Sequence, residues 1–249
     1  MVKGFSKQGI LFIATVLVLS IVLLGCQSSD ADQASVELEG QARLISENIE
    51  EWFAGEELHN YVANDRDYDW FIDQGDTGQY SNSNCGPSST VMAMKWLDED
   101  YKETAEEARE EHLLSGGWWY TSTITQYFDN REVDYSFMKL DQDGKGIEDL
   151  KNVIDEEQIA ILCVSMDYIT RETDSNLRIN RFYDYDDGHF LIMKGYVEID
   201  DKLYFEVYDP NNWGMTYEDG SPKGLDRYYL ADELFDAAYN WYEFAIVLG

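Results

Sequence analysis

Residues 79–94 read Gln79-Tyr80-Ser81-Asn82-Ser83-Asn84-Cys85-Gly86-Pro87-Ser88-Ser89-Thr90-Val91-Met92-Ala93-Met94. Gly86 lets the backbone turn tightly directly after the cysteine. Pro87 suits the first turn of a helix, where its missing N–H costs nothing. We therefore predict a helix over residues 86–97. Its unsatisfied N–H groups and the positive end of its dipole would then face the thiol of Cys85.

A helix start beside a cysteine favours the thiolate, which is the nucleophilic form of the side chain. Free cysteine has a pKa of about 8.5, and a helix N-terminus or a neighbouring histidine lowers it. The formal charge of the chain, −32, acts in the opposite direction, so local contacts must outweigh it. The backbone N–H of Cys85 and the side-chain amide of Gln79 are the expected donors to an oxyanion.

His189 is the best candidate for a base among the three histidines of the chain. It follows Gly188 and precedes the apolar run Phe190-Leu191-Ile192-Met193, which places it at the mouth of a predicted buried strand. The alternative is a structural histidine at a strand end. His112 lies in an acidic helical stretch and is expected to face solvent.

Asp209 is the expected orienting group for His189, because it follows the strand that should pair with the histidine strand. If a three-residue loop separates residues 198 and 202, His189 faces Asn211 and Asp209 lies one diagonal away on the same face. A two-residue loop would turn Asp209 to the other face. The triad therefore requires an odd-length loop or a bulge. Asn211 is the alternative orienting residue, and Asp209 could instead be a turn residue before Pro210.

Helical spacing in the first half of the chain and strands in the second half predict an α+β fold. Expected helices cover residues 36–58, 86–97, 104–114, 123–128, 147–154 and 228–239. Expected strands cover residues 158–166, 189–196, 203–208 and 242–248, and residues 61–78 are expected to be irregular.

The N-terminus is typical of an exported lipoprotein. Lys3 and Lys7 precede an apolar run over residues 10–24, which is short for a membrane span and suits a signal peptide. The run ends Leu23-Leu24-Gly25-Cys26, which resembles a bacterial lipobox. We expect residues 1–25 to be a signal peptide, residues 26–60 a tether and helix, and residues 61–249 the main domain. Lipidated Cys26 would hold the chain at the extracytoplasmic side of the cell membrane; the alternative is an uncleaved transmembrane anchor.

Composition limits the partners of the main domain. The strong negative charge argues against nucleic acid, since no basic patch is available for phosphates. Apolar residues make up 44% of the 249 residues and aromatic residues 14%, enough to build a core. The sequence indicates no cofactor and no oligomeric state.

The three cysteines are expected to have separate roles. Cys26 is assigned to the lipid, and Cys163 lies in the apolar run 159–164 and should be a buried strand residue. Cys85 is then a free thiol in an oxidising compartment, which indicates a reactive group. A Cys85–Cys163 disulfide is the alternative.

Metal binding is not expected. Residues 141–152 resemble a calcium loop, but Lys145 stands where an oxygen ligand belongs and Asn152 stands where an acid belongs. No cluster of His and Cys has the spacing of zinc ligands. Trp118, Trp119 and Trp213 are candidates for the lining of a substrate cleft, although aromatic pairs are more often core residues.

The pattern Gln-(five residues)-Cys-Gly-Pro, Gly-His opening an apolar strand and a strand ending in Asp-Pro resembles a known family. These elements are similar to those of the papain-like cysteine peptidases that process double-glycine bacteriocin leaders. The resemblance implies a papain-like fold, in which a helical half carries the cysteine and an antiparallel sheet carries the histidine. It also implies Gln79 as oxyanion donor, Cys85 as nucleophile, His189 as base and Asp209 as orienting residue.

The expected function is that of an extracytoplasmic, lipid-anchored cysteine peptidase acting on a peptide or protein. The sequence contains no phosphate-binding loop of the kind found in transporter-fused peptidases, so we expect a stand-alone relative. Two alternatives are a thiol acyltransferase or transglutaminase-like enzyme, and an inactive peptide-binding module of the same fold.

Overall fold

The computed structural model describes residues 52–53, 55–112, 116–142, 145–174 and 176–249. The expected signal peptide, Cys26, the tether and most of the expected N-terminal helix lie outside these residues. Within the described ranges, none of the helices has both the length and the apolar character needed to cross a bilayer.

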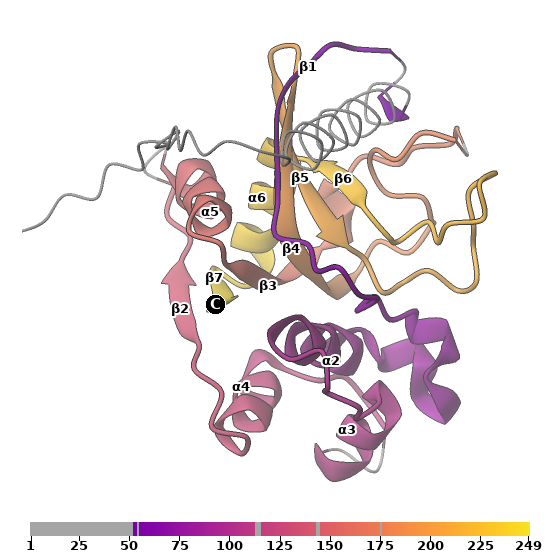
Figure 1. Ribbon diagram of the computed structural model, residues 1–249, viewed down its shortest axis with the longest axis vertical. Helices are drawn as coiled ribbons and strands as arrows, with labels where there is room; N and C mark the ends of the chain where they lie inside the picture. The colour runs from indigo at the N-terminus through magenta and orange to yellow at the C-terminus, as the bar shows by residue number, and fades with distance from the viewer. Residues whose placement is uncertain (1–51, 54, 113–115, 143–144, 175) are drawn as a thin grey trace, which may run out of the picture. The chain divides into compact units, whose positions relative to one another are not determined.

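The centre of the described chain is a sheet of seven antiparallel strands (Figure 1). Six strands follow the order β2 (Ser136–Lys139), β7 (Phe244–Leu248), β3 (Ile159–Ser165), β4 (Gly188–Ile199), β5 (Lys202–Tyr208), β6 (Arg227–Leu230). The seventh, β1 (Leu58–Ala63), pairs with the second half of β4, whereas β3 pairs with the first half. With the helices, this sheet confirms the expected α+β class.

Helices cover both faces of the sheet. On one side lie α2 (Cys85–Leu97), α3 (Ala105–His112) and α4 (Thr121–Asp129); α5 (Gly146–Asp155) and α6 (Ala231–Trp241) pack on the other (Figure 1). Successive residues of a strand point to opposite faces, so Ile161 and Cys163 join the core under α2 while Leu162 and Val164 join the core under α6. This two-sided burial explains the uninterrupted apolar run of β3.

Two expectations about the elements are wrong, and one strand was not anticipated. Residues 228–230 belong to strand β6, and the helix expected from residue 228 begins at Ala231; the aromatic pair Tyr228-Tyr229 suits a strand that pairs with β5. Leu58, the expected end of a helix, begins strand β1, which runs across the expected boundary at residue 60. The edge strand β2 was not expected, since it is short and mostly exposed.

The β4–β5 hairpin contains the bulge that the sequence argument requires. Ile199 pairs with Lys202 around a two-residue turn, which alone would place Asp209 on the opposite face from His189. The register shifts between Met193 and Gly195, and beyond the shift Ile192 pairs with Tyr208. The extra residue is Lys194, and it restores the register that keeps the aspartate and the histidine on one face.

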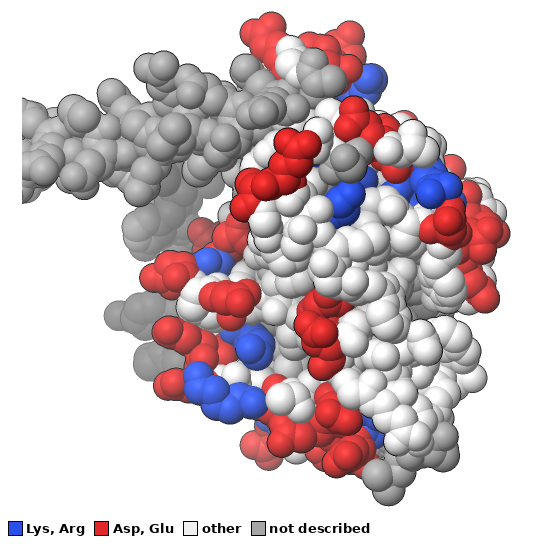
Figure 2. Space-filling view, turned by 90° about the vertical axis from the view of Figure 1, so that its right-hand side faces the viewer, with Lys and Arg blue, Asp and Glu red and all other residues white. Residues whose placement is uncertain are grey.

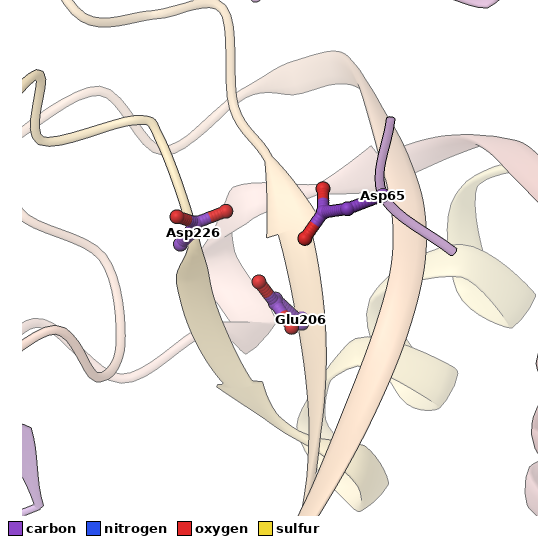
Figure 3. Close-up of side chains that lie close together, drawn as sticks. All are labelled: Asp65, Glu206 and Asp226. Carbon is purple, nitrogen blue, oxygen red and sulfur yellow. The ribbon is translucent and has the colours of Figure 1, made fainter. Parts of the chain in front are cut away.

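Lys194 is held by three carboxylates that converge from separate segments (Figure 3). Its Nζ, fully buried, lies 2.8 Å from Asp65, 2.5 Å from Glu206 and 2.9 Å from Asp226. The carboxylate oxygens lie within 4.8 Å of one another, and the ammonium supplies the positive charge between them. A Cβ on Gly195 would lie 2.7 Å from a backbone oxygen of β1, so this position requires glycine.

Replacing Lys194 with Met is expected to destabilise the fold by about 3–5 kcal/mol, because it leaves the buried carboxylate of Glu206 without its cation. The control is Lys202→Met in the same hairpin, whose exposed pair with Glu56 should contribute less than about 1 kcal/mol. Urea denaturation measures both free energies of unfolding. Equal losses in the two variants would show that the buried cluster does not stabilise the bulge.

Candidate active site

Cys85 is placed by the first turn of α2 and by a fixed residue before it. Cys85 itself is buried, with 5% of its surface exposed. The side chain of Asn84 is buried and donates to the backbone oxygen of Thr77 at 2.9 Å and to its hydroxyl at 2.8 Å. A Cβ on Gly86 would lie 2.7 Å from the Cβ of Trp119. Close packing against Trp119 therefore requires glycine directly after the cysteine.

His189 and Asp209 are joined directly by a hydrogen bond of 2.7 Å between Nε2 and Oδ1. The carboxylate is fully buried and also accepts the N–H of Asn211 at 2.9 Å and the hydroxyls of Tyr183 at 2.7 Å and Tyr229 at 2.5 Å. Because Nε2 faces the carboxylate, Nδ1 is the ring nitrogen left for another partner. The structure thus brings the expected histidine and aspartate together.

The side chain of Asn211 is engaged elsewhere. Its Oδ1 accepts the indole N–H of Trp213 at 2.6 Å. Between the two orienting residues that the sequence allowed, the geometry favours Asp209.

The buried pair sets the charge state of His189. Burial alone lowers the pKa of His189, but the Asp209 carboxylate and a hydrogen bond with Cys85 raise it, to about 10. Burial raises the pKa of Asp209, and the opposing charge of His189 with hydrogen bonds from His189, Tyr229 and Tyr183 brings it below its ordinary value. At neutral pH the raised pKa of His189 therefore favours an imidazolium beside the Asp209 carboxylate.

Two hollows border both Cys85 and His189. The first, which we call the aromatic hollow, measures about 460 Å³. It is lined by Cys85, Trp118, Trp119, Tyr120, Thr121, Cys163, Tyr185, Asp187, Gly188, His189, Phe190, Trp241 and Tyr242. The second, the amide hollow, measures about 370 Å³. It is lined by Gln74, Asn82, Cys85, Trp118, Tyr183, Tyr185, His189, Asn211 and Trp213. The thiol and the imidazole border both hollows.

The expected cleft tryptophans take different positions around these hollows. Trp118 is 50% exposed and borders both, and Trp213 is 43% exposed and borders the amide hollow. Trp119 touches the aromatic hollow but is almost wholly buried against Gly86. Trp241, at the end of α6, is 48% exposed in the aromatic hollow. It was not anticipated, since its segment reads as an ordinary amphipathic helix.

Gln79, the expected oxyanion donor, is not brought to the site. It is exposed and borders a separate, smaller hollow beside Tyr80 and Arg109. A different glutamine, Gln74, lies there instead. It is 4% exposed and lines the amide hollow with Cys85 and His189. Its Nε2 donates to the carbonyl of Ser81 at 3.2 Å and carries a second N–H.

Gln74 is tied to the loop after β5. The backbone N–H of Gln74 donates to the carbonyl of Pro210 at 2.8 Å. The neighbouring Asp73 accepts the N–H groups of Trp213 at 2.9 Å and Gly214 at 2.7 Å and the side-chain amide of Asn212 at 2.8 Å. Asp73 is the one sequence signal for this arrangement, because an aspartate before a glycine-containing turn is typical of such a loop.

Cys163 borders the aromatic hollow next to Cys85. Both cysteines are free, so the alternative of a disulfide between them is not what the structure contains. Burial and the nearby Cys85 raise the pKa of the Cys163 thiol to about 12. Cys163 therefore stays protonated at neutral pH.

Comparisons with known proteins assign no family and no function. No family model matches the sequence, and no curated protein matches it. Among solved structures, 31 chains match. One is a Bacillus anthracis protein provisionally described as a C39-like peptidase, with 14% sequence identity and a TM-score of 0.49, covering 76% of this chain and 97% of its own. At this level of similarity the function has to be argued from the residues of the chain itself.

Replacing Asp209 with Asn is expected to lower the pKa of His189 from about 10 to about 6.5 or below, since burial remains and the opposing charge is lost. In the wild type, the raised pKa stabilises the fold fully below about pH 6.5, and this contribution is lost as the pH rises through about 10. The variant should lack that pH dependence.

NMR titration of the histidine ring, assigned with His189→Gln, measures this pKa. The control is Asp184→Asn, an exposed residue paired with Arg171, which should leave it unchanged. An unshifted His189 in the Asp209 variant would contradict the assignment of the carboxylate as its orienting partner.

Proposed function

We propose that this protein is an extracytoplasmic, lipid-anchored cysteine peptidase in which Cys85 is the nucleophile. One observation carries the proposal: Cys85 at the start of α2 lies against His189, whose other nitrogen is hydrogen-bonded to buried Asp209. A nucleophile, a base and a third group that orients the base form the arrangement used for covalent acyl transfer. The two hollows give an acyl group and a leaving group separate places beside the thiol.

The chemistry follows from the order of these groups. The Cys85 thiolate attacks the carbonyl carbon of the scissile amide, and the oxyanion accepts hydrogen bonds from the N–H of Cys85 and from Nε2 of Gln74. His189 gives its proton to the leaving amine, and a thioester remains on Cys85. His189 then takes a proton from water, which attacks the thioester and releases the acid, and this step restores the Cys85 thiolate beside protonated His189. Asp209 keeps the imidazole ring oriented throughout.

One alternative differs from this reaction in its last step, and the other involves no reaction at all. An amine in place of water at the thioester gives an acyltransferase or transglutaminase-like reaction. A peptide-binding module would hold its ligand in the same hollows and form no thioester.

The membrane anchor at Cys26 remains a proposal from the sequence. Labelling of the protein with a radioactive fatty acid tests it, and the label should be absent from the Cys26→Ser variant.

Cleavage of a broad peptide library should depend on Cys85. Mass spectrometry of the library after incubation with the wild type should show new amino and carboxyl ends, which Cys85→Ala abolishes. The Cys163→Ala variant is the matched control, because its thiol borders the same hollow but is not expected to attack substrate. Products in which amines are exchanged would indicate the transferase. A thiol that captures no electrophile, together with no cleavage, would indicate the binding module.

Gln74→Ala is expected to lower kcat about 10²–10³-fold with a smaller change in KM, because an oxyanion donor acts mainly on the transition state. Gln79→Ala, which removes the same amide from an exposed position, should change neither constant appreciably. Steady-state kinetics with any substrate from the library measures both. Equal effects of the two substitutions would remove Gln74 from the mechanism.

A further inference from the structure

Arg109 is a buried cation directly behind the candidate nucleophile. It lies in α3, and only 1% of its surface is exposed. Its Nη2 donates to the carbonyl of Ser83 at 2.6 Å, its Nη1 donates to the carbonyl of Gly117 at 2.9 Å, and its Nε donates to the side-chain oxygen of Asn84. One guanidinium therefore connects the segment that precedes Cys85 with the segment that carries Trp118.

Arg109 meets neutral acceptors in the part of the chain that the structure describes. Among the residues that the structure describes, it forms no ion pair with an acidic side chain. Arg131, by contrast, is paired with Glu103 and Glu111. A buried guanidinium that meets only neutral acceptors is costly, which suggests that its charge is used by a group that becomes negative.

The other groups around Arg109 leave Cys85 as the buried candidate for that role. Glu106 and Glu110 lie on the same helix, line a small hollow with it and are exposed, so water screens them. The ring of Tyr80 lies 5.7 Å from the guanidinium. Burial lowers the pKa of Arg109, whereas Cys85 and Tyr80 in their charged forms raise it.

We propose that Arg109 is a positioning residue for Cys85: it fixes the backbone that presents the thiol and supplies positive charge that favours the thiolate. This inference rests on the proposed function, in which Cys85 is the nucleophile. A buried arginine at this place would offset the net negative charge of the chain, which disfavours a thiolate. Acidic side chains dominate the margin of the face in Figure 2, and the chain as a whole, at −32, opposes ionisation of a thiol. Arg109 acts from the helical side, as the His189 imidazolium does from the sheet.

The pH dependence of Cys85 alkylation tests the proposal. Iodoacetamide labels the protein over a range of pH, and peptide mass mapping reports Cys85 separately from Cys163. Arg109→Gln should raise the midpoint for Cys85 by about one pH unit, which is about tenfold less thiolate below the midpoint. Arg109→Lys, which keeps the charge, should recover most of the shift. Arg66→Gln makes the same change in net charge at an exposed position and should leave the midpoint unchanged.

A second pair of variants keeps Arg109 in place, in case the buried substitution prevents folding. Tyr80→Glu sets a carboxylate beside the guanidinium and should raise the midpoint, while the uncharged Tyr80→Gln should not. If folded Arg109→Gln keeps the wild-type midpoint, or if Tyr80→Glu does so where Arg109→Gln does not fold, the proposal is overturned. A shifted midpoint in a protein that cleaves no peptide would instead reject the peptidase function and retain the role of Arg109.

Discussion

The hydrogen bond between His189 and Asp209 is the interaction on which the rest of the site depends. It joins His189 on β4 to Asp209, directly after β5, at 2.7 Å, and both residues are almost fully buried. A buried carboxylate is tolerated only when its oxygens are satisfied, and Tyr183 and Tyr229 supply the remaining donors. The same carboxylate raises the pKa of the histidine to about 10. Ring orientation and ring charge therefore have one origin.

That hydrogen bond is possible only because β4 contains one residue more than β5 requires. The two-residue turn of the hairpin would separate His189 and Asp209 onto opposite faces, and the bulge at Lys194 corrects this. The bulge in turn depends on a cluster of charges remote from the nucleophile in sequence, in which one ammonium meets three carboxylates. The Nζ of Lys194 also lies 4.8 Å from the ring centre of Tyr208, the residue before Asp209. Stability of the sheet and geometry of the site are thus linked.

Cys85, the proposed nucleophile, is positioned from the other half of the fold. Asn84 and Arg109 fix the turn before Cys85 through hydrogen bonds that stay within the helical half. In the proposed site each half contributes one cation, Arg109 from α3 and protonated His189 from β4. In a chain with 50 acidic and 18 basic residues, cations held close to a cysteine oppose the overall negative charge.

The sequence by itself determined what depends on neighbouring residues. Gly86 and Pro87 specify a helix that starts at Cys85, and apolar runs specify the strands that carry the histidine, because turn chemistry and hydrophobic period are local properties. The tertiary structure alone decided that Asp209 rather than Asn211 meets His189, because a one-residue bulge reverses every later face. It also placed Gln74 rather than Gln79 beside Cys85, because the path of that irregular segment is set by bonds to a loop far along the chain. The sequence alone does not predict the buried position of Arg109 for the same reason, because its partners come from two other segments.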